Sequence, residues 1–233
     1  MRIKLDALAT SIGGLGGIDV EQGFAPALQK VVDAAKKLLG ATGAGLVLVD
    51  GDGNLRWASV SDQPTQNVED SQERLAQGPC QDAFEQQRPI YVADVRDDPA
   101  WRELARVMVE EGMVAALSVP VELNGGAIGT LDIYFDTPWK WDASEVHAVR
   151  AYAAVVASLL QHAVVAHVKG RLADQLQTAL EHRSVLEQAK GVLMERKSLD
   201  QSEAFELLRR TARSQRRKIV EVAREVIDGI ELP

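Results

Sequence analysis

The sequence is poor in the residues that support disulfide and metal chemistry. Its one cysteine, Cys80, can form no disulfide within the chain, and no cysteine cluster is available for zinc. A reducing, cytoplasmic location fits this composition. The four histidines include no pair four residues apart, the spacing at which two imidazoles on a helix share a metal ion. We therefore expect no metal site and no cofactor.

The sequence also lacks the motifs of common enzyme classes. It contains no Walker phosphate loop, no Gly-x-Ser-x-Gly and no His-Glu-x-x-His. The glycine-rich stretch 11–17 is not followed by Lys-Ser or Lys-Thr, so we interpret it as an N-terminal turn. The longest mostly apolar region, 146–168, is broken by polar and charged residues, and the first residues have no signal-peptide core. We predict a chain that is not an enzyme, has no catalytic residue and does not enter a membrane.

What the sequence does contain is an uneven distribution of charge. Its 233 residues carry 34 acidic and 26 basic side chains, a net charge of −8. Residues 1–165 have a net charge of −10, whereas residues 166–233 have a net charge of +2. This contrast predicts two domains with different partners, 1–165 and 166–233.

The first of these domains alternates strand and helix patterns. Its apolar spacing and turn residues predict helices over 24–39, 66–76, 80–87 and 97–109, and strands over 45–50, 55–61, 90–93, 113–123 and 127–135. The last two strands are joined through Asn124, Gly125 and Gly126, a strong hairpin signal. An antiparallel sheet flanked by helices is the expected fold.

A long helix pattern follows the last strand. Asp142 and Glu145 form a capping box, and apolar residues recur every fourth position from Val156 to Leu180 with no proline in between. A stripe of this length favours pairing of two helices, so we predict a homodimer through residues 142–180. The alternative is an ordinary amphipathic helix that folds back on the domain that follows.

The last fifty residues form three amphipathic helix patterns, and Asp200 with Glu203 forms a capping box at the start of the second. Between 183 and 218 the sequence has ten basic and five acidic residues, a local net charge of +5. Arg183, Lys190 and Met194 project to one side of the first helix, which we expect to lie opposite the apolar stripe. A basic face on an acidic protein suggests a polyanionic partner, and a solvated surface is the alternative.

The C-terminal motifs resemble the ANTAR domain. They are ALEHRSVLEQAKGVLMER, then AFELLRRTAR and then KIVEVA. The resemblance implies a three-helix RNA-binding domain of antitermination regulators. Two positions depart from that family: Ser198 stands where the family usually has Gly, and residues 215–217 stand where it usually has Asn before the third helix.

The N-terminal motifs resemble a GAF domain. They include QGPCQDAFEQQRPIYVADV and SVPVELNGGAIGTLDIYF. The resemblance implies a small-molecule or redox sensor whose ligand is unknown, with a cavity over strands 113–123 and 127–135. Cys80 has two interpretations: a thiol activated by the start of a helix, or a small buried residue.

Together these resemblances imply a regulator with a defined architecture and partners. We expect an α+β, GAF-like antiparallel sheet flanked by helices, then a long helix and an all-α three-helix ANTAR bundle. The implied function is signal-responsive transcription antitermination through RNA stem-loops in nascent transcripts. The alternative is a GAF sensor whose helical tail only dimerises or binds a protein partner. The residues predicted to bind RNA are Arg183, Gln188, Lys190, Gly191, Met194, Arg213 and Lys218. For Gly191, close packing of the second helix is the alternative explanation.

Overall fold

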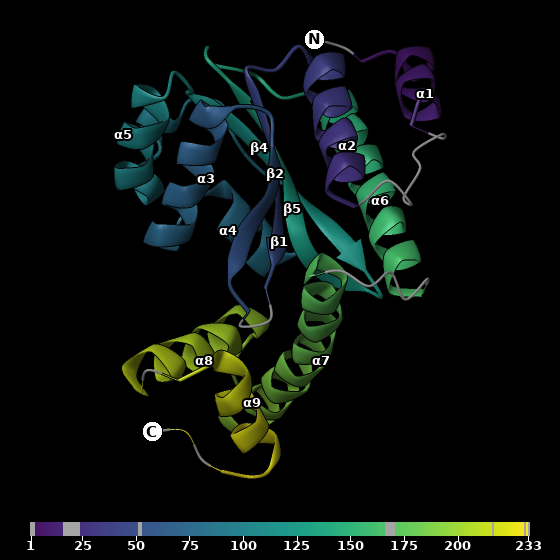
Figure 1. The fold of residues 1–233 in the computed structure, drawn as a ribbon. Helices are drawn as coiled ribbons and strands as arrows, with labels where there is room; N and C mark the ends of the chain where they lie inside the picture. Colours follow the sequence, from purple (N-terminus) through teal and green to yellow (C-terminus); the bar gives the residue numbers. More distant parts are fainter. Residues whose placement is uncertain are drawn as a thin grey trace. The chain divides into compact units, whose positions relative to one another are not determined.

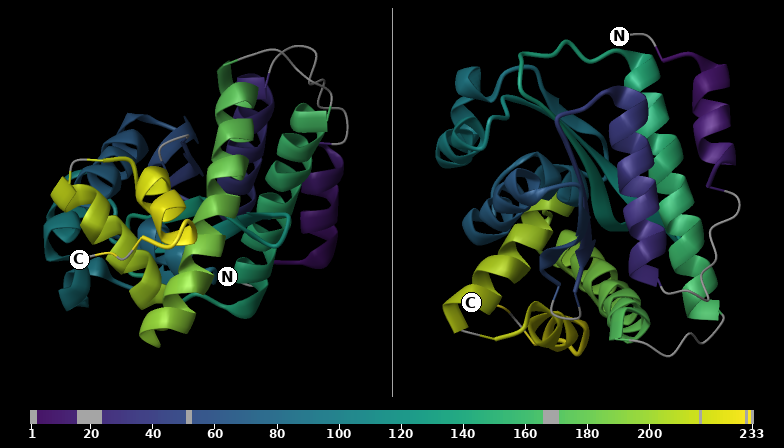
Figure 2. Two further views of the ribbon diagram at one scale, coloured as in Figure 1. Left: turned by 90° about the horizontal axis from the view of Figure 1, so that it is seen from below. Right: turned by 45° about the horizontal axis from the view of Figure 1, so that its top comes forward.

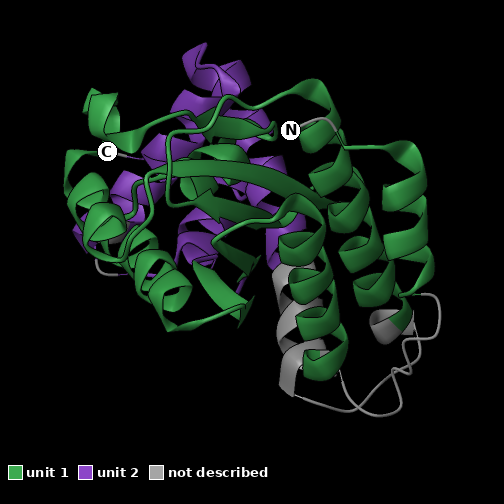
Figure 3. Cartoon of the chain, turned by 90° about the horizontal axis from the view of Figure 1, so that it is seen from above, with its two compact units in different colours: residues 1–48, 55–168 green, residues 49–54, 169–233 purple. Residues whose placement is uncertain are grey.

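A computed structural model describes residues 3–15, 24–50, 53–165, 171–215, 217–230 and 232. The chain divides into two compact units, residues 1–48 with 55–168 and residues 49–54 with 169–233 (Figure 3). The first unit holds all five strands of the described chain together with helices, whereas the long segment of the second is helical. The α+β class predicted from the sequence is confirmed.

The first unit is built on a five-stranded sheet of order β2-β1-β5-β4-β3. The strands are β1 Gly43–Val49, β2 Leu55–Val60, β3 Ile90–Val92, β4 Ala115–Leu123 and β5 Gly126–Phe135. The pairs β1–β5, β5–β4 and β4–β3 are antiparallel. The β4–β5 turn has positive φ angles at Asn124 (52°) and Gly125 (82°), the conformation that an Asn-Gly hairpin favours.

Helices cover both faces of this sheet (Figures 1 and 2). One layer holds α2 Phe24–Leu39 and α6 Ala143–Val165, with α1 Leu5–Gly13 packed against them. The other holds α3 Gln63–Leu75, α4 Pro79–Gln86 and α5 Arg102–Glu110. All ten residues of β5 are buried, as its central place between two helical layers requires.

Most predicted elements lie within a few residues of the observed ones, and α2 has the predicted bounds. The helix predicted over 97–109, which Asp97 and Asp98 were expected to cap with Pro99 in the first turn, is confirmed in its Asp98 cap but not in its start. Two short 3₁₀ turns, η2 Val95–Asp97 and η3 Pro99–Trp101, precede α5, which begins only at Arg102. The reason is capping: Asp98 accepts a hydrogen bond from the Ala100 backbone N–H (2.9 Å), which closes a turn around Pro99 before the α-helix starts.

The N-terminal segment also differs from its prediction. The sequence predicted only a turn over 11–17, but residues 5–13 form α1. Leu8 of α1 is buried, and the Ser11 and Tyr152 hydroxyl oxygens are 2.5 Å apart. Contacts with α2 and α6 thus stabilise a helix whose own sequence signal is weak.

The predicted capping box at the start of α6 is confirmed. Asp142 N–H donates to Glu145 Oε2 (3.0 Å), and Glu145 N–H donates to Asp142 Oδ1 (3.2 Å). The next helix, α7, spans Arg171–Lys197. The long helix pattern predicted after the last strand falls partly on residues 166–170, which lie outside the described residues. Among the residues that the structure describes, no helix is long and apolar enough to span a membrane.

Candidate functional site

The second unit contains the three helices predicted at the C-terminus. They are α7, α8 Gln201–Gln215 and α9 Ile219–Ile227. Each contributes one apolar face to a common core, as the helical spacing predicted. The most buried members of this core are Ala189, Leu193, Ala204, Leu208, Val222, Ala223 and Val226.

The loop between α7 and α8 explains one departure from the ANTAR pattern. Ser198 has a φ of 52°, in the left-handed region that favours glycine. The predicted capping box follows it: Asp200 N–H donates to Glu203 Oε2, and Glu203 N–H donates to Asp200 Oδ1, both at 2.8 Å. The turn therefore requires a residue that can follow a helix in left-handed geometry, and this chain supplies serine in place of glycine.

The start of α9 explains the second departure. Lys218 occupies the N-cap position, and its side chain makes no capping hydrogen bond. Arg217 instead forms a two-pronged ion pair with Glu225, with Nη2–Oε1 at 2.6 Å and Nη1–Oε2 at 2.9 Å. The entry to α9 is therefore held by an arginine that reaches two turns along the helix, in place of an asparagine cap.

The predicted basic face opposite the core is wrong for Lys190. Lys190 lies four residues after Leu186, hence about 40° from it around the helix, on the same side. Its side chain is only 7% exposed, and its Nζ lies 2.7 Å from Glu187 Oε1. Arg183 is half-buried. The projection failed because these two basic residues border the apolar stripe instead of lying opposite it.

Two other predicted residues lie on a different side of α7. Gln188 and Gly191 line a shallow hollow with a volume of about 540 Å³, and both are exposed. The rest of its lining is Val192, Glu195, Arg196 and Ile227. A Cβ added at Gly191 would meet no heavy atom within 4 Å. Close packing of the second helix therefore does not account for this glycine.

The remaining predicted residues are Met194 on α7, Arg213 on α8 and Lys218 before α9. Met194 is exposed (39%), which is unusual for a large apolar side chain. Lys218 is exposed at the start of α9, and Arg213 belongs to the last turn of α8. On α7 the predicted residues thus fall on two sides: Arg183, Lys190 and Met194 project together beside the core stripe, whereas Gln188 and Gly191 line the hollow.

Part of the positive charge is already paired inside this unit. Arg209 Nη2 lies 2.9 Å from Glu206 Oε1, in addition to the Lys190–Glu187 and Arg217–Glu225 pairs. The hollow contains one arginine, Arg196, which is exposed and is absent from the predicted RNA-binding residues. Its place in the ANTAR-like motif, two residues after Met194, was the signal that could have identified it.

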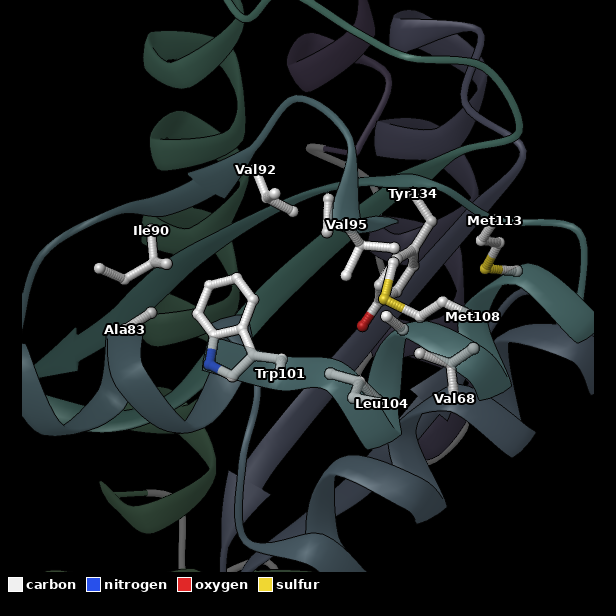
Figure 4. Packing of buried hydrophobic residues seen from close by; sticks show 12 residues of the cluster. Val68, Ala83, Ile90, Val92, Val95, Trp101, Leu104, Met108, Met113 and Tyr134 are labelled. Atoms are coloured by element: carbon white, nitrogen blue, oxygen red, sulfur yellow. The ribbon is translucent and has the colours of Figure 1, made fainter. Parts of the chain in front are cut away.

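The first unit offers a different kind of surface and interior. The face of the sheet under α3, α4 and α5 is packed with buried side chains, among them Trp101, Met108 and Tyr134 (Figure 4). A hollow of about 490 Å³ lies beside β4, between residues 119–123 and the exposed side of α6. It touches β4 and not β5, so a cavity over both strands stays a prediction.

Cys80 fits the structural interpretation and not the activated-thiol one. It is 1% exposed, and burial, together with the nearby charges of Asp132 and Glu69, raises the pKa of its thiol well above the ordinary value. Among the described residues, no three His, Cys, Asp or Glu side chains gather where they could hold a metal ion.

Comparison with known proteins assigns both halves of the chain. The GAF domain family model matches residues 23–161, and the ANTAR domain family model matches residues 174–227. Both are sensor and regulatory domains, and ANTAR is an RNA-binding domain of antitermination regulators. A search of curated proteins finds no match to the chain.

Solved structures share the fold of the first unit at low sequence identity. The GAF domain of a phosphoenolpyruvate-protein phosphotransferase from Coxiella burnetii is 20% identical, covers 71% of this chain and 96% of its own, and has a TM-score of 0.57. A type II free methionine-R-sulfoxide reductase from Thermoplasma acidophilum is 20% identical, covers 62% of this chain and 96% of its own, and has a TM-score of 0.51. These likenesses concern the fold alone. The family matches decide the assignment: the chain belongs to the GAF domain family and carries a C-terminal ANTAR domain, the combination of a GAF–ANTAR regulator.

Proposed function

We propose that this chain is a cytoplasmic, homodimeric transcription antitermination regulator that is not an enzyme. Its ANTAR domain binds stem-loops in nascent RNA, and its GAF domain responds to a small-molecule signal. The observation that carries the RNA half of this proposal is Gly191. A glycine within a helix lowers helix stability by about 1 kcal/mol relative to alanine, yet no neighbouring atom occupies the space beside it.

The surroundings of Gly191 suit an unstacked nucleotide. Sequence-specific RNA recognition mostly uses loop bases that leave the stack and are read at their edges. The hollow offers the Gln188 amide as donor and acceptor, the Val192 side chain as an apolar contact and the Arg196 guanidinium for stacking or phosphate contact. A side chain at position 191 would fill the floor on which such a base rests.

Lys190 and Arg213 contribute charge to the same complex. Lys190 must leave Glu187 to reach a phosphate, because its ammonium group is buried beside that carboxylate. RNA binding therefore exchanges one ionic partner for another at this position. Arg213 and Lys218 belong to the junction of α8 and α9, where they contact the backbone of the bound stem.

The test is filter binding of the full chain to a hairpin RNA, to duplex RNA of equal length without a loop and to duplex DNA. We expect the hairpin to bind most tightly. Lys190→Ala and Arg213→Ala should each weaken hairpin binding while circular dichroism shows unchanged helicity. Lys30→Ala, on an exposed position of α2, makes the same change of charge in the other unit and should have no effect.

A second candidate function has an observation of its own. Three basic residues, Lys190, Arg209 and Arg217, are already paired with glutamates of the same unit, as expected for a bundle whose role is protein contact. In that case the tail serves only for dimerisation or for a protein partner. Equal binding of all three nucleic acids, with no loss in either variant, would support it over the RNA proposal.

A further inference from the structure

A buried polar row crosses the sheet of the GAF domain on the face under α3, α4 and α5. The strand register aligns Gly45 of β1, Asp132 of β5 and Ser118 of β4. The Asp132 and Ser118 side chains are completely buried. Glu69 reaches this row from α3, since its Oε1 occupies the space that a Cβ at position 45 would need. Glycine at 45 thus allows a carboxyl group to lie directly on the sheet.

The hydrogen bonds of this row are incomplete on one side. Both oxygens of Glu69 accept: Oε1 from the Tyr134 hydroxyl and Oε2 from the Gln72 amide, each at 2.9 Å. Asp132 Oδ2 accepts from the Thr130 hydroxyl at 2.8 Å. Asp132 Oδ1 and Ser118 Oγ, both buried, have no hydrogen-bond partner among the described residues. The Ser118 hydroxyl is near enough to Asp132 to lower its pKa, but no hydrogen bond of normal geometry satisfies Ser118 Oγ or Asp132 Oδ1, so both lack the partner that a buried polar atom normally has.

The electrostatics of the row are one-sided as well. Burial raises the pKa of Asp132 to about 7, although the nearby Ser118 and Thr130 hydroxyls oppose part of the rise. Burial, and then the charge of Asp132, raise the pKa of Glu69 well above its usual value, and Asp70 adds to the rise.

Among the described residues, no basic side chain of the elements packed against the row contributes to these pKa shifts. From α4, Cys80 carries a raised thiol pKa, caused by burial and by the charges of Asp132, Glu69 and Asp82. Tyr134 of β5 has a raised pKa for the same kind of reason. From α5, Leu104 and Met108 are apolar and fully buried, and they belong to the same core cluster as Tyr134. The site combines two carboxyl groups, two unpartnered oxygens and charged neighbours that are all acidic.

We propose that Asp132, Ser118 and Glu69 bind a small protonated amine, either ammonium itself or the head group of a primary amine. The proposal rests on the sensor role proposed for the GAF domain and names the chemical class of its signal. A protonated amine supplies what the row lacks, namely a positive charge and several N–H donors on one atom. A water molecule supplies donors without charge, and a metal ion finds no group of three ligands in the described residues.

Proton release gives this binding a distinctive signature. The amine binds the ionised carboxyl pair, so a proton held by the pair leaves as the amine enters. Affinity therefore rises with pH through the region of about 7 in which Asp132 ionises. A ligand recognised only by hydrogen bonds to neutral carboxyls has the opposite dependence.

The experiment measures thermal unfolding of the full chain in four chloride salts of equal ionic strength. Ammonium and methylammonium are the probes, and tetramethylammonium, which has no N–H donor, and sodium are the controls. A ligand that binds the folded state raises the unfolding midpoint. We expect a higher midpoint in ammonium or methylammonium than in either control, and a larger difference at pH 8 than at pH 6. A response to ammonium alone identifies the free ion, and a response to both identifies an amine head group.

Variants connect the effect to the row. Asp132→Asn keeps the shape, removes the charge and should abolish the difference between salts, and Ser118→Ala should reduce it while leaving both carboxyl groups in place. Asp33→Asn, an exposed position of α2, makes the same change of charge in the other helical layer and should retain the full effect. If Asp132→Asn does not fold, Ser118→Ala decides.

Equal midpoints in all four salts at both pH values would overturn the proposal and leave a buried water as the partner of the row. Filter binding to hairpin RNA, measured on the same preparation, separates this inference from the proposed function. Intact RNA binding without a salt difference removes only the amine site. A salt difference without RNA binding removes only the RNA-binding role of the tail.

Discussion

Replacing Gly191 by alanine should stabilise the ANTAR domain and weaken its binding to RNA. The stabilising part follows from helix propensity, since alanine in a helix interior is more stable than glycine by about 1 kcal/mol. No strain offsets this gain, because a Cβ at position 191 meets no heavy atom within 4 Å. For a domain of 60–100 residues, about 1 kcal/mol corresponds to a rise of roughly 4–8 °C in the unfolding midpoint.

The weakening part follows from the hollow. The added methyl group enters the hollow lined by Gln188 and Glu195, which is where the proposed function places a loop base or the RNA backbone. We expect a loss of at least about tenfold in hairpin affinity, equivalent to roughly 1.4 kcal/mol. The assays are thermal unfolding and filter binding on the same full-length protein.

Gly13→Ala is the matched control for this experiment. Gly13 ends α1 in the other unit, and a Cβ added there would also meet no heavy atom within 4 Å. This change should leave RNA affinity unchanged. A Gly191→Ala protein that is more stable and binds hairpin RNA as tightly as before would refute the assignment of the hollow to RNA. A destabilised variant would refute the open space itself.

Three other predictions concern the rest of the molecule. The pKa of Asp132 is raised from 3.8 to about 7, so its stabilising contribution is complete below about pH 4 and is lost as pH rises through 7. The free energy of unfolding of Asp132→Asn, measured with urea, should therefore rise by up to about 4 kcal/mol relative to that of the parent between pH 4 and 8. A difference between the two proteins that does not change with pH would contradict this prediction. Ser198→Gly should stabilise the protein by about 1 kcal/mol because φ at this position is 52°, and a loss of stability would show that the serine side chain matters. Leu172→Asp should shift the dimer predicted through residues 142–180 toward monomer in light scattering, whereas a parent protein that is monomeric at micromolar concentrations would refute the dimer itself.

Local signals were sufficient to predict most of the fold. The capping boxes at Asp142 and Asp200 have the predicted hydrogen bonds, and the Asn124–Gly125 turn has the predicted backbone geometry. These features are reliable because they involve residues within four positions of one another. The helix α1 was not predicted for the converse reason: its local sequence pattern is weak, and tertiary contacts of Leu8 and with Tyr152 stabilise it.

The candidate functional surfaces were harder to predict from the sequence than the fold. The family resemblance selected Gly191, but only the space around it distinguishes an interface from a packing contact. For the buried row, the sequence contains one signal that the prediction did not use, an aspartate in the middle of the apolar strand LDIYF. Its partner Glu69 lies more than sixty positions away on another element, and Gly45, which makes room for it, carries no chemistry of its own. Long-range arrangements of this kind require the register of the sheet.

The ion pairs within the ANTAR domain reduce the positive charge that is available to attract RNA. The net charge of residues 166–233 is only +2, so long-range attraction of RNA is weaker than the local count of ten basic residues suggests. At Lys190, a phosphate must compete with Glu187 at 2.7 Å. Salt weakens that pair as well as the phosphate contact, so each such residue adds less to the salt dependence than a solvated lysine does. If the hollow at Gly191 holds a loop base, as proposed, discrimination between RNAs depends mainly on how that loop fits, because steric fit is less sensitive to ionic strength than ionic contacts are.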